Sequence, residues 1–219
     1  MSYGMCLCNA NGCVLSSDSR NTITKANGER SYNDHFIKIF YLKLMGILVF
    51  IGGLSQLDGI TLREVMERFD KFCLSEIAVY NRLCQAIEEF TKHYNGSKEI
   101  VVCFAATTID SGPLSYSFQW QNGHFSSLQK NESIWFYHAG INPLALLYNK
   151  ECEDGIIRTN VNLDAFSMDD MIQFSKHIIS TAIYAHKYHL DALNTVAGDI
   201  QIMACDRYGN TQSLLFGTK

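Results

Sequence analysis

The sequence predicts an α+β protein, and the order of its periodic segments is the main reason. Two apolar hairpins come first, and two consecutive amphipathic segments with helical spacing follow them. Strand patterns then return on either side of one more long amphipathic segment. Helices segregated from antiparallel hairpins indicate α+β, most simply two sheets packed face to face with helix layers outside. The length favours one domain over residues 1–219.

The first half of the chain alternates short apolar runs with turn residues. Asn9-Ala10-Asn11-Gly12 reads as a hairpin turn, and Gly52-Gly53 marks the point where the period changes from 2 to 3.6. The predicted elements are strands at 2–9 and 13–17, a polar loop at 21–34, strands at 36–42 and 47–53, and helices at 54–73 and 76–94.

The second half begins with strands and ends with strands. Asn122-Gly123 predicts a two-residue hairpin turn, and Ser167-x-x-Asp170 predicts the start of the last helix. The predicted elements are strands at 99–107, 114–121 and 134–138, a short helix at 142–148, a long helix after Ser167, and strands at 199–205 and 212–216.

The composition argues against nucleic-acid and membrane partners. The chain has 18 basic and 22 acidic residues, a formal charge of −4 and no Lys/Arg run. It shows no signal-peptide pattern and no apolar segment of the roughly 18 residues that a membrane helix needs. Its eight cysteines lie mostly in apolar runs, as small buried side chains do in a reducing compartment. We therefore expect a cytoplasmic protein.

Two patterns resemble metal sites but are incomplete. Cys6-x-Cys8 lacks a second cysteine pair, and His177, His186 and His189 on the last predicted helix lack a third ligand at a convincing spacing. Structural cysteines and histidines are the simpler interpretation, so we expect no metal.

The first residues carry a candidate nucleophile. If Met1 is removed, Ser2 presents a hydroxyl and an α-amine on one residue. An α-amine titrates near pH 7.7–8.0, roughly, so it can act as the general base for that hydroxyl. Many chains begin Met-Ser without any such role, so the dipeptide alone does not assign the chemistry.

Two further positions are candidates on chemical grounds. Lys38 lies in an apolar strand, where a lysine needs a partner; Asp18 is the obvious one, and a side chain reaching solvent is the alternative. Gly52-Gly53, at a predicted strand-to-helix junction, predicts exposed N–H groups that could bind an oxyanion. An ordinary tight turn explains the same two glycines.

Taken together, these positions resemble the proteasome β-type branch of the N-terminal nucleophile hydrolases, closest to its bacterial ancestral-β-subunit and heat-shock-peptidase members. That family begins at its nucleophile, reaches an Asp-Ser-Arg motif sixteen residues later, and continues to a lysine and then a Gly-Gly strand end. The same order occurs here, as Ser2, Asp18-Ser19-Arg20, Lys38-Ile39-Phe40 and Ile51-Gly52-Gly53. Lys38 and Gly52 share one offset, as if about four residues were inserted after Arg20.

The resemblance implies a four-layer αββα sandwich and a serine version of the family's threonine-type endopeptidase. Ser2 would be the nucleophile, Lys38 paired with Asp18 would lower its effective pKa, and the Gly52 N–H would bind the oxyanion. Ser19 and Arg20 would support the site, and Phe50 and Leu54 would line an apolar substrate pocket. The resemblance further implies peptide or unfolded-protein substrates, no cofactor, a homo-oligomeric ring or spiral, and an ATPase as a further partner.

Three departures from the family keep other functions open. Serine replaces the usual threonine, Ala139 stands where a supporting serine is common, and Asn194 lies near the family's C-terminal support residues. The alternatives are a catalytically inactive structural ring subunit of the same fold and an amidase that acts on a small molecule.

Overall fold

The structure is a computed structural model of the 219-residue chain. It describes residues 3–24, 29–94, 100–107, 113–130, 134–137, 162–188 and 196–218. The predicted helix at 142–148 lies outside these ranges, as do Ser2, Ala139 and Asn194.

One antiparallel sheet joins the two ends of the chain. The hairpin predicted at the start forms its centre, and the two strands predicted at the end pair beside it. Its strand order is β13 (Ile134–Tyr137), β1 (Gly4–Asn9), β2 (Gly12–Asp18), β14 (Ile200–Asp206) and β15 (Thr211–Phe216). Both β1 and β2 are buried along their whole length, which explains why their sequences are apolar runs instead of alternating patterns.

A second antiparallel sheet contains the middle of the chain. The Asn122-Gly123 turn has positive φ at both residues, as a two-residue hairpin requires, and it leads into β11 as predicted. The strand order is β11 (His124–Phe125), β10 (Leu114–Gln121), β9 (Ile100–Thr107), β6 (Ile47–Gly53) and β5 (Ile39–Leu42), with β12 (Gln129–Lys130) also paired to β10.

The helices begin at side-chain caps. Thr61 and Glu64 form a capping box at α1 (Leu62–Phe69), and Ser75 caps α2 (Glu76–Thr91). Ser167 and Asp170 make reciprocal hydrogen bonds at the start of α4 (Met168–Tyr188), where the sequence predicted a capping box. A short 3-10 helix (Leu163–Ala165) precedes α4.

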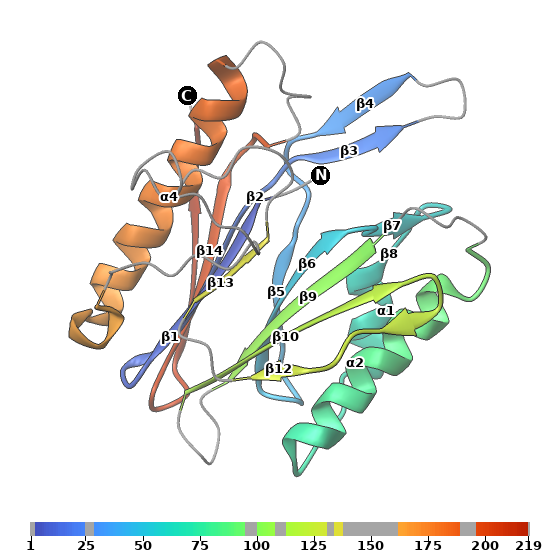
Figure 1. Ribbon diagram of the computed structural model, residues 1–219, viewed down its shortest axis with the longest axis horizontal. Helices are drawn as coiled ribbons and strands as arrows, with labels where there is room; N and C mark the ends of the chain where they lie inside the picture. The colour runs from blue at the N-terminus through green and yellow to red at the C-terminus, as the bar shows by residue number, and fades with distance from the viewer. Residues whose placement is uncertain are drawn as a thin grey trace.

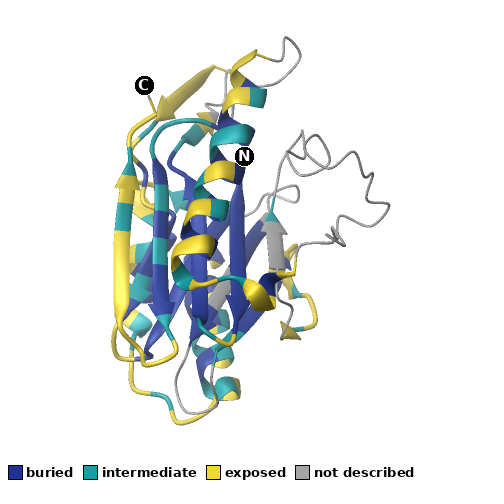
Figure 2. Ribbon diagram, turned by 90° about the vertical axis from the view of Figure 1, so that its left-hand side faces the viewer, coloured by how far each residue is buried: buried dark blue, intermediate teal, exposed yellow. Residues whose placement is uncertain are grey.

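Three apolar clusters pack the sheets and helices together. Figure 1 shows α4 on one side of the sheets and α1 and α2 on the other. One packs α4 on the five-stranded sheet, through residues such as Met5 and Ile179. A second lies between the two sheets, where Leu15 meets Phe50. A third packs α1 and α2 on the outer face of the six-stranded sheet. Figure 2 shows the strands largely buried and α4 exposing its outward side. This mixed arrangement is compatible with the predicted αββα sandwich.

Two predicted elements are wrong. The polar stretch 21–34 is not only a loop, because β3 (Asn21–Thr24) and β4 (Arg30–Asn33) pair as an antiparallel arm. The helix predicted from residue 54 begins only at Leu62, since β7 (Gln56–Leu57) and β8 (Ile60–Thr61) form a small hairpin before it. Asp58 and Gly59 in the turn of this hairpin both have positive φ. An Asp-Gly pair is typical of a hairpin turn, and the helix begins only after it. Within the described ranges, no helix is long and apolar enough to cross a bilayer.

Candidate active site

Asp18 is fully buried at the end of β2, and its carboxylate is the centre of the site. Oδ1 accepts hydrogen bonds from the backbone N–H of Tyr3 at 2.8 Å and from Lys38 Nζ at 2.9 Å. Oδ2 accepts from the backbone N–H groups of Arg20 at 3.2 Å and Ala197 at 3.3 Å. Four donors therefore compensate one carboxylate, and they come from the start of the chain, the strand end, the second sheet and the segment before β14.

Lys38 immediately precedes β5, and its side chain extends to the Asp18 carboxylate. Its side chain is 2% exposed, so the pairing predicted with Asp18 holds and the solvent-reaching alternative is wrong. Burial lowers the pKa of Lys38 below its ordinary value, and the nearby Asp18 carboxylate opposes that shift. Within the described residues, Lys38 Nζ donates a hydrogen bond to Asp18. An ammonium group has three N–H donors, so this bond uses one of the three.

The backbone around Lys38 is fixed by both sheets. Gln201 on β14 accepts from the Lys38 N–H at 3.0 Å and donates to the Phe36 carbonyl at 2.7 Å, so one side chain clamps the segment before β5. The Lys38 carbonyl accepts from the Ile51 N–H of β6 at 3.0 Å. A lysine held at its backbone loses less freedom when its ammonium is bound.

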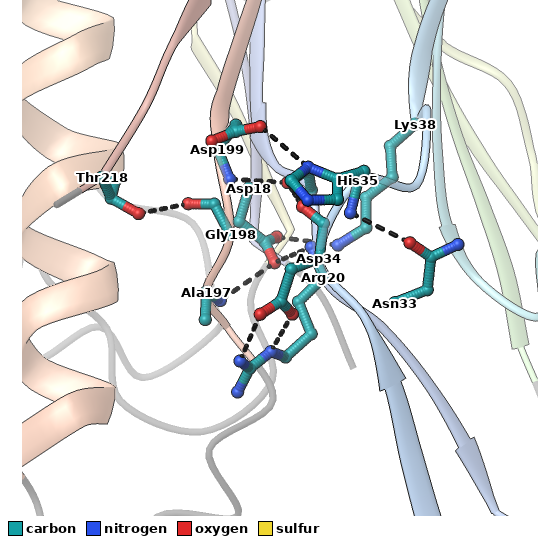
Figure 3. A network of polar contacts seen from close by, with 11 residues as sticks. Asp18, Arg20, Asn33, Asp34, His35, Lys38, Ala197, Gly198, Asp199 and Thr218 are labelled. Atoms are coloured by element: carbon teal, nitrogen blue, oxygen red, sulfur yellow. Dashed lines mark hydrogen bonds and ion pairs between the residues drawn. The ribbon is translucent and has the colours of Figure 1, made fainter.

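Ser19 and Arg20 continue the network away from Asp18, and Figure 3 shows Arg20 beside Asp34. Ser19 Oγ donates to the Asp34 carbonyl and accepts from the Asp199 N–H at 2.6 Å. The Arg20 guanidinium binds the Asp34 carboxylate through Nε at 2.5 Å and Nη2 at 2.7 Å, and it lies 4.8 Å from the Tyr32 ring centre. This bidentate pair lowers the pKa of Asp34 and raises that of Arg20.

Gly52 lies within β6, opposite Val102, and not at a helix terminus. The sequence-based reason for an oxyanion site there is therefore wrong, because the next helix begins at Leu62. Gly52 is nevertheless closely covered, since an added Cβ would lie 2.6 Å from the Tyr137 ring. Gly53 follows with a φ of +80°, so the strand ends in a backbone conformation that favours glycine.

The predicted pocket residues belong to different clusters. Phe50 is fully buried between the sheets, and a Cβ added to Gly4 would lie 2.2 Å from its ring. Leu54 instead packs at the margin of the cluster under α1 and α2. The structure therefore brings Tyr3, Asp18 and Lys38 together directly, and it places Phe50 against the strand that follows the N-terminus.

Sequence reasoning missed three parts of this site. Gln201, Asp34 and the Ala197 N–H all contact its core or its support. Gln201 gave no distinct signal, because Ile200-Gln201-Ile202 has the ordinary apolar-polar alternation of a strand. Nothing local in the sequence pairs Asp34 with Arg20.

No metal-binding group emerges from the described residues. Among them, no set of three or more His, Cys, Asp or Glu side chains could hold a metal ion. His177 is exposed and His186 is buried on α4, whereas His189 lies outside the described ranges.

Comparisons with known proteins give a fold neighbour but no sequence family. No protein-family model matches the chain, and no curated protein matches it. Among solved structures, the chain is similar to an Anbu (Gly-1) mutant from Hyphomicrobium sp. strain MC1, with a TM-score of 0.66 and 9% identity over 100% of this chain and 88% of that one. Anbu is a proteasome-like bacterial ancestral β-subunit. At this identity the likeness is one of fold, and the fold of this chain is of that proteasome-like type.

Proposed function

We propose that this chain is a proteasome-type hydrolase of peptide bonds whose nucleophile is Ser2, once the residue before it is removed. The proposal includes one N-terminal nucleophile hydrolase domain over residues 1–219, with four αββα layers. The fold neighbour supports the general type. Among the named site residues, the contacts of Asp18 and Lys38 support the proposal, whereas Ser2 lies outside the described residues.

The shared oxygen of Asp18 is the observation that carries the proposal. Oδ1 binds both Lys38 Nζ and the amide N–H of Tyr3, and that amide is bonded directly to Ser2. A buried ammonium and the backbone N–H that follows the proposed nucleophile in the chain therefore donate to the same carboxylate oxygen. Burial of an ion pair is expensive, so its contact with the Tyr3 N–H, the first described backbone group after the proposed nucleophile, favours a role in the reaction.

The proposed chemistry uses the chain's own groups. Ser2 Oγ attacks the substrate carbonyl, and its proton passes to the Ser2 α-amine, directly or through a water molecule. The positive charge of Lys38 favours the developing alkoxide, and the Gly52 N–H donates to the oxyanion. The amine then protonates the leaving group, and water hydrolyses the ester that remains. No cofactor takes part in these steps.

Two features bear on the proposed substrate. Phe50 and Leu54 stay our candidates for an apolar pocket; Phe50 is completely buried against Gly4, whereas Leu54 is partly exposed. The paired arm of β3 and β4 leaves the sandwich immediately after Arg20 (Figure 1). We propose peptides or unfolded segments as substrates, with an apolar residue before the cut bond.

We also propose a homo-oligomeric ring or spiral in the cytoplasm, with an ATPase as a further partner. The apolar side chains at the connection between α1 and α2 support self-association, because Phe72, Leu74 and Ile77 are all more than half exposed. Exposed apolar groups that are neighbours in the chain are typical of contact surfaces. Light scattering at micromolar concentration should therefore give more than a monomer mass.

The decisive test compares two forms of the protein. One form begins at Ser2 and the other retains Met1, and intact mass confirms each. We expect the first form to hydrolyse fluorogenic peptides and to react with an electrophile that traps a hydroxyl and an amine on one residue. The form that retains Met1 should do neither, because an amide nitrogen cannot accept the proton at neutral pH.

A Ser2→Ala variant with a free amine is the matched control, because it keeps the base and removes the nucleophile. Equal hydrolysis by the Met1 form would contradict the proposed mechanism. Absence of both labelling and hydrolysis in the Ser2 form would favour the structural-subunit alternative. Turnover of small amides without turnover of peptides would favour the amidase alternative.

A further inference from the structure

Three cysteines lie side by side at the end of the inter-sheet cluster that is remote from Asp18. Cys8 on β1 is directly opposite Cys13 on β2, and Cys13 is directly opposite Cys205 on β14. All three belong to the cluster between the two sheets. Alternation along β1 places Cys6 on the same face. The hairpin turn at residues 9–12 lies immediately beyond this group.

Cys8 and Cys13 are in direct sulfur contact. Their Sγ atoms are 3.0 Å apart, whereas a disulfide bond is about 2.05 Å long. Residues directly opposite in an antiparallel pair have Cα atoms roughly 4.5–5.5 Å apart, which lies inside the range of about 4.4–6.8 Å that disulfides span. Small side-chain rotations can therefore join these two sulfurs without a change of backbone register.

The two thiols are chemically unequal. The Cys13 hydrogen bond lowers the pKa of Cys8, and the same bond, followed by burial, raises the pKa of Cys13. Cys8 is also the more accessible of the two, at 8% exposed against none for Cys13. Thiolate character and access together determine which thiol meets an oxidant first. Here both favour Cys8.

We infer that Cys8 and Cys13 form an oxidisable dithiol, which a peroxide converts to a cross-strand disulfide. The Cys8 thiolate attacks one peroxide oxygen and becomes a sulfenic acid, with release of water after protonation. Cys13 then attacks the Cys8 sulfur, its proton leaves with the hydroxyl group, and a second water forms. Two thiols and one hydrogen peroxide thus give one disulfide and two waters. A dithiol reductant reverses the change.

Cys205 is the competing partner, and its contacts disfavour it. Its sulfur is within 3.7 Å of the Asp206 carbonyl, while the short sulfur contact of Cys13 is made to Cys8. Cys205 is therefore placed to receive Cys13 only after the first pair has opened. The inference does not depend on the proposed function, because these cysteines lie at the other end of β2 from Asp18.

The test is differential thiol labelling after exposure to hydrogen peroxide. The full-length protein is treated, quenched in acid, alkylated under denaturing conditions and digested with trypsin. Cys6, Cys8 and Cys13 all lie before Arg20 without an intervening Lys or Arg, so one tryptic peptide carries the three. Before alkylation, the oxidised peptide should be about 2 Da lighter than the reduced peptide. After alkylation, it should carry an alkyl group on one cysteine only. Fragmentation should place that alkyl group on Cys6.

Cys103 is the internal control, because it lies opposite Ile51 and Phe118, is completely buried, and has its pKa raised by that burial. It should stay alkylatable at the peroxide dose that links Cys8 to Cys13. Cys13→Ser should abolish the linked peptide, and Cys205→Ser should leave it unchanged. A link from Cys13 to Cys205, or three alkylated cysteines in the wild-type peptide when the half-buried Cys73 is oxidised, would overturn the inference; both readouts need only wild-type protein.

Discussion

The two ends of strand β2 are both buried, but charged side chains cover one end and cysteines cover the other. At one end Asp18 and Lys38 bury two full charges. At the other end Cys13 is covered by Cys8 and Cys205, which are small and nearly apolar. Both ends lie close to the junction of the two sheets, and both residues of β2 are completely buried. The cysteine end shows that the two sheets can pack together without buried charges.

This difference indicates what the ion pair is for. A buried ion pair is often no more stabilising than apolar side chains of similar volume, because both charges lose their hydration. Packing alone would favour a second cluster like that of the cysteines. The buried Lys38, held at its backbone by Gln201, therefore fits the role proposed for it in hydrolysis, since stability of the fold does not require its charge.

The largest expected effect is that of Lys38→Met on hydrolysis. Removing the ammonium from beside the proposed nucleophile should lower kcat/KM for a peptide about a thousandfold. Asp18 keeps three backbone N–H donors, so the unfolding free energy should fall by only about 2–3 kcal/mol, less than for a fully unpaired charge. Peptide turnover and urea unfolding on the same preparation measure both quantities.

Lys43→Ala is the matched control for this variant, since Lys43 lies just after β5 and is exposed. It should change turnover by less than twofold. Turnover by folded Lys38→Met within about tenfold of wild type would remove Lys38 from the mechanism. The Asp18–Lys38 pair would then serve only to pack this end of β2, as the cysteines pack the other end.

At the cysteine end, Cys13→Ala should give the opposite pattern. The sulfur is completely buried in the inter-sheet cluster, so its removal leaves a small cavity and should cost about 1–2 kcal/mol of unfolding free energy. Turnover per folded molecule should stay within twofold of wild type. Thermal unfolding with peptide hydrolysis checks both. Loss of turnover in a folded Cys13→Ala protein would show that the two ends are coupled and are not the independent regions compared above.

Much of the fold was predictable because burial leaves a periodic signature. The doubly buried β1 and β2 give continuous apolar runs, and the capping pair of Ser167 and Asp170 marks the start of α4. The helix at residue 54 was wrong because an apolar periodicity was extended across the Asp58-Gly59 turn. The β3–β4 arm was missed because both of its strands are short and polar, and β4 is exposed throughout.

The site was predictable only where burial conflicts with polarity. Lys38 in an apolar strand signals a partner, and Asp18 is that partner. The other donors to Asp18 are backbone N–H groups of Tyr3, Arg20 and Ala197. Backbone groups carry no residue-type signal, so their convergence on one carboxylate depends on the tertiary fold and was not predictable from local sequence.

The smallest expected effect is that of Asp34→Asn, which asks whether the outer support matters as much as the buried pair. Arg20 lowers the pKa of Asp34 below its ordinary 3.8, so this pair stabilises the folded state above pH 3.8 and the stabilisation is lost as pH falls through the lowered pKa. The Asp34 side chain is 38% exposed, and an exposed pair of this kind contributes only about 0.5 kcal/mol. Wild type should therefore exceed Asp34→Asn by about that amount in urea unfolding at pH 7. The difference should decrease as the pH falls below 3.8 and the carboxylate becomes protonated, and it should also shrink in high salt. Peptide turnover should change by less than twofold, because Ser19 binds the Asp34 carbonyl and not its carboxylate. A difference that does not decrease at all as the pH is lowered from 7 through the acid range would show that the carboxylate supports this end of the molecule through its shape and not through its charge.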